Sequence, residues 1–195
     1  MAKNEPWRDA EFEKRALELV DGKRRAHVVG CAELAVKLAR KLGADERSAW
    51  RAGMLHDCTK RLKTDEQLKS CAEYGIIINQ SDEESPLVLH AYTAAELSRR
   101  EFGLSDEECS AIRWHTTGHA DMTQLEKAVY LADCIEPTRD YPGVEKLRKI
   151  AKEDVEAAVL AAAARTIAHL AEQNRPIHEK TIEMYNDLLR KTRKA

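Results

Sequence analysis

Apolar residues recur every three to four positions along nearly the whole chain, the spacing expected of one face of an α-helix. No segment alternates apolar and polar residues in the manner of a half-buried strand. The periodic stretches are separated by residues that favour helix ends, chiefly glycine after a last turn and serine, threonine or proline before a first one. The pattern predicts helices at about 9–20, 23–42, 45–60, 64–75, 86–103, 144–150, 153–172 and 178–191, and two more that begin after 105 and 123.

Three of these helices are expected to begin with a capping box, in which a hydroxyl side chain pairs with a glutamate or glutamine three residues later. The three pairs are Thr64 with Gln67, Ser105 with Glu108, and Thr123 with Glu126. Residues 76–84 and 137–143 are the expected irregular connections. No internal repeat or linker divides the chain. We therefore expect an all-α fold, a single compact helical bundle formed by one domain over residues 1–195.

Charged residues are plentiful but balanced, with 32 lysines and arginines against 34 aspartates and glutamates, interspersed along the chain. This distribution argues against a nucleic-acid partner. The one basic cluster, Arg190, Lys191, Arg193 and Lys194, is typical of the solvated end of a last helix, where cations are favoured. No apolar run approaches the roughly 20 residues that cross a bilayer, so no membrane partner is expected.

Five cysteines are present, their number is odd and none forms a CxxC pair. Residues 1–14 lack the apolar core of a secretory signal. Both features favour a reduced, cytoplasmic protein with structural thiols. A chain of this length can bury a sizeable core without a structural metal, so any bound metal is expected to be functional.

The segment GMLHDCTK, residues 53–60, places two polar groups inside a helical turn that otherwise looks buried. Small residues on the same face, among them Gly53, allow another helix to approach closely. Lys60 follows four residues after His56 and three after Asp57, which puts all three on one face of the predicted helix. An imidazole and a carboxylate can bind a cation while an ammonium group neutralises a phosphate on that cation. The segment therefore predicts adjoining metal and anion sites.

Two more polar groups lie beside apolar helical faces. His27 is next to the apolar stripe of the second helix and one turn from Arg24. Asp133, in VYLADCIEP, follows an apolar face directly, and a buried carboxylate needs a cation, a metal or hydrogen-bond donors. Taken alone, His27 fits a hydrogen-bonded core or boundary histidine better than a ligand. Asp133 taken alone fits a carboxylate satisfied by Arg139 or by the backbone equally well.

Three further histidines lie in the middle of the chain. His90 is at the edge of an apolar stripe in SPLVLHAYTAAEL. His115 is followed by Thr-Thr-Gly, which breaks the helix and leaves hydroxyl groups beside the imidazole, a natural environment for phosphate. His119 has no apolar face beside it and is expected to be a surface or loop histidine. Five helices or helix ends thus each present a metal-competent group, and facing helices are how bundles build metal sites.

The order H…HD…H…H…D on an all-helical chain resembles the HD-domain superfamily of metal-dependent phosphohydrolases. Six local segments are similar to successive blocks of the YqeK-type family of bacterial hydrolases, which cleave dinucleoside tetraphosphates such as diadenosine tetraphosphate (Ap4A) symmetrically. They are RRAHVVGCAELAVKLA, LHDCTK, LVLHAYTAAEL, AIRWHTTG, YLADCIEPTRDYPGVEKLR and PIHEKTIEMYN, and together they span about residues 20–188. Arg25 and His119 depart from the family, which often has an aromatic residue and an arginine at these positions.

The resemblance implies roles for particular residues. His27, His56, Asp57 and Asp133 would hold an iron ion, and Asp57, Lys60, His90 and His115 would be catalytic. The residues expected along the nucleotide are Arg24, Asp57, Cys58, Thr59, Lys60, His90, His115, Asp133, Arg139, Pro176, Ile177, His178, Glu179, Lys180 and Thr181.

Two imidazoles and two carboxylates suit Fe(II), Mn(II) or another first-row divalent ion with open positions better than a closed structural zinc site. The expected reaction is attack of a metal-activated water on a β-phosphorus of Ap4A, with two ADP molecules as products. Lys60 and Arg139 would neutralise the polyphosphate. His90 and His115 would bind its oxygens, protonate the leaving group or hold a second metal, and these alternatives stay open.

The expected partner is therefore a small dinucleoside polyphosphate, with ADP or a GDP-like product, and a homodimer is compatible with the sequence. Two alternatives remain. The first is another HD-domain activity, a nucleotidase or a cyclic-nucleotide phosphodiesterase, since the metal set is shared and the pocket decides the substrate. The second is a metal-dependent nucleotide sensor that turns over poorly.

Overall fold

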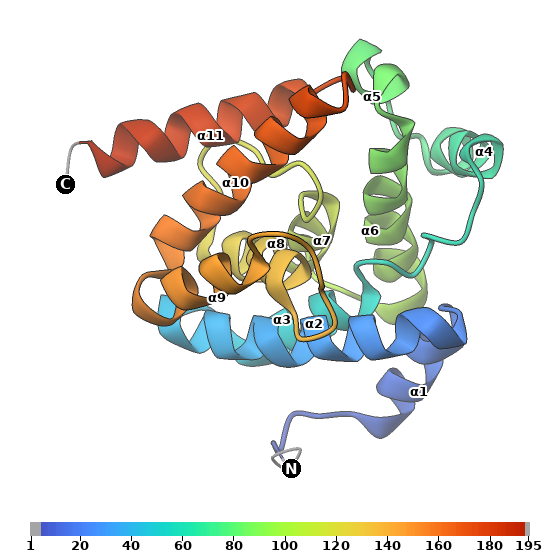
Figure 1. Cartoon of the computed structure of the whole chain (residues 1–195). Helices are drawn as coiled ribbons and strands as arrows, with labels where there is room; N and C mark the ends of the chain where they lie inside the picture. The colour runs from blue at the N-terminus through green and yellow to red at the C-terminus, as the bar shows by residue number, and fades with distance from the viewer. Residues whose placement is uncertain (1–4, 194–195) are drawn as a thin grey trace.

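The computed structural model describes residues 5–193, and all regular secondary structure in that range is helical (Figure 1). Lys194 of the basic cluster and the first four residues lie outside the described range. The helices are α1 (Ala10–Glu18), α2 (Gly22–Leu42), α3 (Glu46–Leu55), α4 (Thr64–Tyr74), α5 (Gln80–Glu84), a short 3-10 helix (Pro86–Val88), α6 (Leu89–Phe102), α7 (Asp106–Arg113), α8 (Gln124–Ile135), α9 (Val144–Glu153), α10 (Val155–Glu172) and α11 (Glu179–Thr192). The predicted all-α fold is confirmed.

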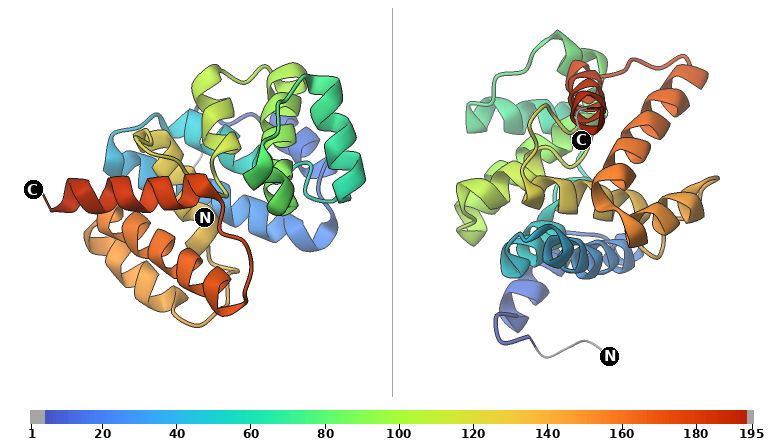
Figure 2. Two further views of the ribbon diagram at one scale, coloured as in Figure 1. Left: turned by 90° about the horizontal axis from the view of Figure 1, so that it is seen from above. Right: turned by 90° about the vertical axis from the view of Figure 1, so that its left-hand side faces the viewer.

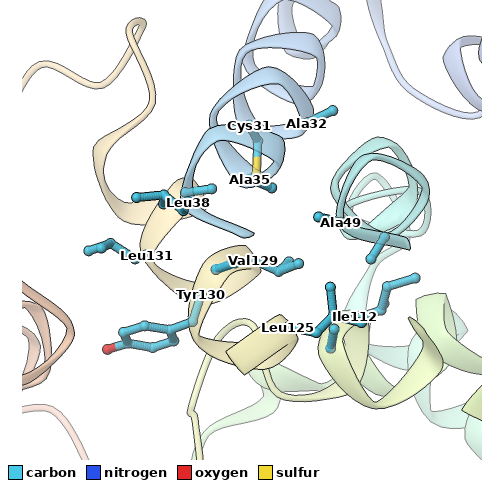
Figure 3. Packing of buried hydrophobic residues seen from close by; sticks show 14 of the residues in the cluster. Cys31, Ala32, Ala35, Leu38, Ala49, Ile112, Leu125, Val129, Tyr130 and Leu131 are labelled. Carbon is cyan, nitrogen blue, oxygen red and sulfur yellow. The ribbon is translucent and has the colours of Figure 1, made fainter. Parts of the chain in front are cut away.

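Helix α8 lies in the middle of the bundle, with α2 and α3 on one side and α11 on the other (Figures 1 and 2). Side chains of α2, among them Cys31, Ala35 and Leu38, face Val129 and Leu131 of α8 in the core (Figure 3). All of these residues are buried. Buried side chains of α2 and α8 therefore meet in the core, which holds these two helices close together.

Helices α2 and α3 approach each other very closely at a glycine. A Cβ atom added at Gly53 would lie 2.6 Å from the Cα atom of Ala32, which is backbone and cannot swing away. The prediction that small residues before His56 admit a neighbouring helix is confirmed.

Two sequence predictions about helix ends are wrong. Helix α3 stops at Leu55 rather than near residue 60, because Nδ1 of His56 donates to the Gly53 carbonyl at 2.7 Å, the acceptor that residue 57 would use in a continued helix. Helix α4 is capped by Lys63 with Glu66 rather than by Thr64 with Gln67. The side-chain amide of Gln67 instead donates to the Thr59 carbonyl at 2.7 Å.

Other helix ends agree more closely with the prediction. The capping boxes that begin α7 and α8, Ser105 with Glu108 and Thr123 with Glu126, are both formed. The segment 76–84 was expected to be irregular but contains α5, which Asn79 caps together with Asp82. In the described range no helix is long and apolar enough to cross a membrane, and all five cysteines carry free thiols.

Candidate metal and phosphate site

The ends of five helical elements bring six side chains to one buried place: His27 from α2, His56 and Asp57 from the end of α3, His90 from α6, His115 after α7 and Asp133 from α8. Their ligand atoms form three overlapping groups in which all atoms lie within 4.8 Å of one another: His27, His56 and Asp57; His56, His115 and Asp133; and Asp57, His90 and His115. All six residues that the sequence marked as metal-competent are thus adjacent.

His27 lies at the centre of the first part of this cluster. Its Nε2 atom is 3.2 Å from Nε2 of His56, 3.2 Å from Oδ1 of Asp133 and 3.5 Å from Oδ2 of Asp57. The His56 Nε2 atom is 3.7 Å from each of the same two carboxylate oxygens. Two imidazole nitrogens and two carboxylates therefore converge on one point.

Asp57 joins this part of the cluster to a second one. Its Oδ1 atom is 3.2 Å from Nε2 of His90 and 3.7 Å from Nε2 of His115, and these two nitrogens are 3.1 Å apart. The two oxygens of one buried carboxylate thus face two different pairs of imidazoles, so Asp57 belongs to two of the three groups of donors.

Hydrogen bonds at the opposite ring nitrogen set the tautomer of all four histidines. Nδ1 donates to a backbone carbonyl in three of them: His56 to Gly53, His90 to Leu87 and His115 to Ile112, at 2.7, 2.6 and 2.6 Å. In His27, Nδ1 donates to the carboxylate of Glu136 at 3.0 Å. Each ring therefore turns its Nε2 atom toward the cluster, and a bound cation would be satisfied by these four converging nitrogens. The donor set fits a divalent metal.

The pKa values of two histidines and two aspartates in the cluster shift as expected for positive and negative groups in contact. Burial opposes a charge on His27 and His56, but neighbouring groups, including the carboxylates of Asp57 and Asp133, outweigh it and raise both pKa values. Burial would likewise raise the pKa of each carboxyl group, yet the adjacent histidines hold both well below their usual range. The carboxylates are therefore ionised at neutral pH.

The pKa values of His90 and His115 shift in the opposite direction from those of His27 and His56. Burial lowers the pKa of His90, and burial together with the neighbouring rings of His56 and His90 lowers that of His115 to about 3. Both rings are therefore neutral at physiological pH and keep their lone pairs available as ligands.

Glu136 is a residue in contact with the cluster that the sequence reasoning missed. It is fully buried, it accepts the hydrogen bond from His27, and it also accepts from the backbone and hydroxyl of Thr138. Gly30 of α2 leaves the room for it, since a Cβ atom there would lie 2.6 Å from Oε2 of Glu136. A carboxylate at the C-terminal end of a helix is electrostatically unfavourable. This unfavourable position is the sequence signal from which Glu136 could have been identified.

Glu136→Gln should weaken metal binding without unfolding the protein. The amide keeps the size of the side chain but loses the charge that orients His27, and the loss of such an outer partner typically costs about 10- to 100-fold in metal affinity. Metal titration of the purified variant measures this, and Glu145→Gln, at an exposed carboxylate on α9, is the control. Equal affinities in both variants and the wild type would contradict the assigned role.

Three cations surround the cluster. Lys60 Nζ is 3.0 Å from Nε2 of His90 and 3.9 Å from Oδ1 of Asp57, although it reaches them from a turn rather than from the predicted helix face. Arg24 donates to Oδ2 of Asp57 at 2.5 Å. Arg139 donates to both the side chain and the carbonyl of Asp133, so the arginine partner that the sequence suggested for this carboxylate is present beside the histidines.

Two cavities open beside the cluster. The first, of about 460 Å³, is lined by Lys60, by the 3-10 helix at residues 86–88, by Thr116 and by Pro176 and Thr181. We call it the Lys60 cavity. The second, of about 420 Å³, is lined among others by Arg24, His27, Arg139 and Tyr141, and we call it the Tyr141 cavity.

Only some of the other residues that were predicted to contact the nucleotide line the Lys60 cavity. His178 lines the Lys60 cavity, but its ring is engaged by Asp82 at 3.0 Å and by the amide of Lys180 at 3.1 Å. Ile177, Glu179 and Lys180 are not among the lining residues of that cavity, and the last two pair with Asn79 and Glu183.

Two other predicted nucleotide residues follow the aspartate in the LHDCTK segment. The side chains of Cys58 and Thr59 are buried, and Thr59 donates to the carbonyl of His90 at 2.8 Å. Cys58 and Thr59 therefore pack in the interior beside the cluster and line neither cavity. His119 contacts Glu126 and Trp114 instead of the cluster.

Comparisons with known proteins agree with this geometry. The model of the HD domain family matches residues 24–138, a range that begins at Arg24 and includes all six clustered side chains. Proteins named symmetrical bis(5'-nucleosyl)-tetraphosphatase from Halalkalibacterium halodurans and Bacillus subtilis are 39% and 37% identical, each alignment covering 85% of this chain and 89% of the relative. A crystal structure described as a predicted HD superfamily hydrolase involved in NAD metabolism, from Clostridium acetobutylicum, superposes with a TM-score of 0.88 at 32% identity and covers 93% of this chain and 96% of its own.

Proposed function

Because the chain belongs to the HD domain family, we propose that its clustered histidines and aspartates serve the symmetrical hydrolysis of diadenosine tetraphosphate to two ADP molecules. The observation that carries the proposal is the convergence of four Nε2 atoms and two carboxylates beside three cations. A metal-binding centre next to positive charge is what hydrolysis of a polyphosphate requires. The two relatives whose alignments cover most of this chain are named for that reaction.

His27, His56, Asp57 and Asp133 would hold the metal, and Asp57, His90 and His115 offer a second group of donors with the same chemistry. Mixed nitrogen and oxygen donors suit Fe(II) or Mn(II). A bound metal would supply Lewis acidity, which lowers the pKa of a water molecule and neutralises charge on phosphate oxygens.

The chain's own cations would bind and orient the substrate. Lys60 lies at the His90 side of the cluster, whereas Arg24 and Arg139 lie at the side of Asp57 and Asp133 that faces His27. Charge-assisted hydrogen bonds from both sides would hold the central phosphates over the buried carboxylates. Burial of the cluster limits the access of bulk water and strengthens these contacts.

The Lys60 cavity is the expected site for one nucleoside. Its walls combine apolar groups, including Leu87, which is 61% exposed, with hydroxyls of Thr116 and Thr181. Its volume of about 460 Å³ lies within the range of about 300–1,000 Å³ found for small-ligand sites. We therefore propose that Pro176 and Thr181 contact the nucleoside and that Lys60 binds the adjoining phosphate.

Product analysis tests the proposed reaction. Protein prepared without oxygen and loaded with Fe(II) or Mn(II) should convert Ap4A to ADP alone, because attack at a β-phosphorus leaves equal halves. AMP with ATP, or free phosphate, would contradict the proposal. A parallel panel of nucleoside monophosphates and cyclic nucleotides tests the other HD-domain activities, and binding of Ap4A without turnover would indicate a nucleotide sensor.

The remaining expectations from the sequence stay predictions. A cytoplasmic location agrees with five cysteines that all remain free thiols. A homodimer would be detected as a doubled mass in light scattering.

A further inference from the structure

We propose that the Tyr141 cavity binds the second nucleoside of the substrate, so that the two halves of one dinucleoside tetraphosphate occupy two cavities at the two ends of the cluster. The inference rests on the proposed function, since only a substrate with two nucleosides needs two such sites. Cleavage in the middle of the polyphosphate leaves one nucleoside diphosphate on each side of the reacting bond. A site with room for only one half would leave the other without contacts.

The two cavities meet the cluster at different residues. The Lys60 cavity reaches it through Lys60, which contacts His90 and Oδ1 of Asp57, and through Thr116, whose hydroxyl is 3.1 Å from Nε2 of His115. The Tyr141 cavity reaches it through His27 itself. The cluster therefore separates the two cavities.

Two arginines connect the cluster to the Tyr141 cavity. Arg24 and Arg139 line this cavity while they contact Oδ2 of Asp57 and Oδ1 of Asp133, the two oxygens that face His27. Lys23 also lines this cavity, as do the carboxylates of Asp21, Glu136 and Asp140. Asp21 accepts from the backbone N–H of Arg24, and Glu136 accepts from His27 and Thr138. Phosphates that leave the cluster in this direction would meet two guanidinium groups, which can bind phosphate oxygens in pairs.

Tyr141 supplies a fixed aromatic surface at this cavity. Its hydroxyl donates to the carbonyl of Cys134 at 2.7 Å, and the guanidinium carbon of Arg165 lies over the ring, 4.1 Å from its centroid. The ring is half-buried against the core and lines the cavity. A ring ordered before binding loses little entropy when a base stacks on it, and stacking tolerates any base.

Two separate nucleoside sites would make the enzyme select its substrate by the presence of a second nucleoside. Ap4A would engage both cavities, whereas adenosine 5'-tetraphosphate would engage one. Cleavage of the latter adds water across a phosphoanhydride bond and gives ADP and pyrophosphate. The preference for Ap4A over adenosine tetraphosphate, expressed as a ratio of kcat/KM values, therefore measures the second site.

The test compares that ratio in the metal-loaded wild type and in Tyr141→Ala. The wild type should prefer Ap4A by at least about tenfold, and the variant should lose most of this preference, as expected from the loss of one aromatic stack. Tyr141→Phe keeps the ring and should keep the preference. Tyr74→Ala is the matched control, because Tyr74 also lies beneath an arginine, Arg100 at 4.7 Å, but lines neither cavity.

Calorimetric titration with ADP, performed on the same proteins, gives a readout that does not need turnover. The wild type should bind two ADP molecules per chain and Tyr141→Ala only one. If the wild type hydrolyses Ap4A but Tyr141→Ala keeps its preference, the second site is overturned and the proposed function stands. If the metal-loaded wild type does not hydrolyse Ap4A, the proposed function fails. The ADP stoichiometry of the wild type then decides the second site, because two molecules per chain support it and one overturns it.

Discussion

Asp57→Ala is expected to abolish both metal binding and hydrolysis. This carboxylate is 3% exposed and is shared by two of the three groups of donors, with Oδ2 toward His27 and His56 and Oδ1 toward His90 and His115. Its removal leaves four buried imidazoles with one carboxylate, so a divalent ion loses charge balance as well as a ligand. We expect metal content near zero and a fall in kcat/KM for Ap4A of about a thousandfold or more.

Elemental analysis of the purified variant and the initial rate of ADP release measure these effects. Asp133→Ala should give the same result, because it removes the second carboxylate of the cluster. Asp65→Ala, at an exposed position in the first turn of α4, is the control and should match the wild type in both measurements. An Asp57→Ala protein with full metal content and full rate would show that the site lies elsewhere.

Gly53→Val is expected to cause the largest loss of stability. A Cβ atom at this position would lie 2.6 Å from Cα and 3.1 Å from N of Ala32, so the backbones of α2 and α3 must separate. Overpacking of this kind costs about 3 kcal/mol of unfolding free energy, and glycine and valine differ little in helix propensity. The same shift moves the Gly53 carbonyl, which accepts from His56, so metal affinity should fall as well.

Urea unfolding of the metal-free proteins measures the change in stability. Gly22→Val is the matched control, because Gly22 begins α2 and a Cβ atom added there would have no neighbour within 4 Å. It should stay within about 0.5 kcal/mol of the wild type. Equal unfolding midpoints for both variants would mean that the contact between α2 and α3 can relax without cost.

The helices themselves follow from local sequence. Periodicity and capping depend on residues a few positions apart, which is why the boxes at Ser105 and Thr123 and the glycine ends of α2, α4 and α6 are where the pattern predicts them. The end of α3 was predicted wrongly because a side chain, His56, competes for a backbone carbonyl. The start of α4 was predicted wrongly because Gln67 is recruited by Thr59, a contact that sequence spacing does not reveal.

The side chains of the cluster could be identified from local sequence alone, because a histidine or aspartate beside an apolar helical face is costly unless it has a partner. The arrangement of these side chains depends on how the helices pack. Asp57 faces two pairs of imidazoles, Glu136 orients His27, and two cavities open at opposite ends of the cluster. These features depend on helices that are distant in the sequence, such as α2 against α8, and no local pattern specifies the distance between them.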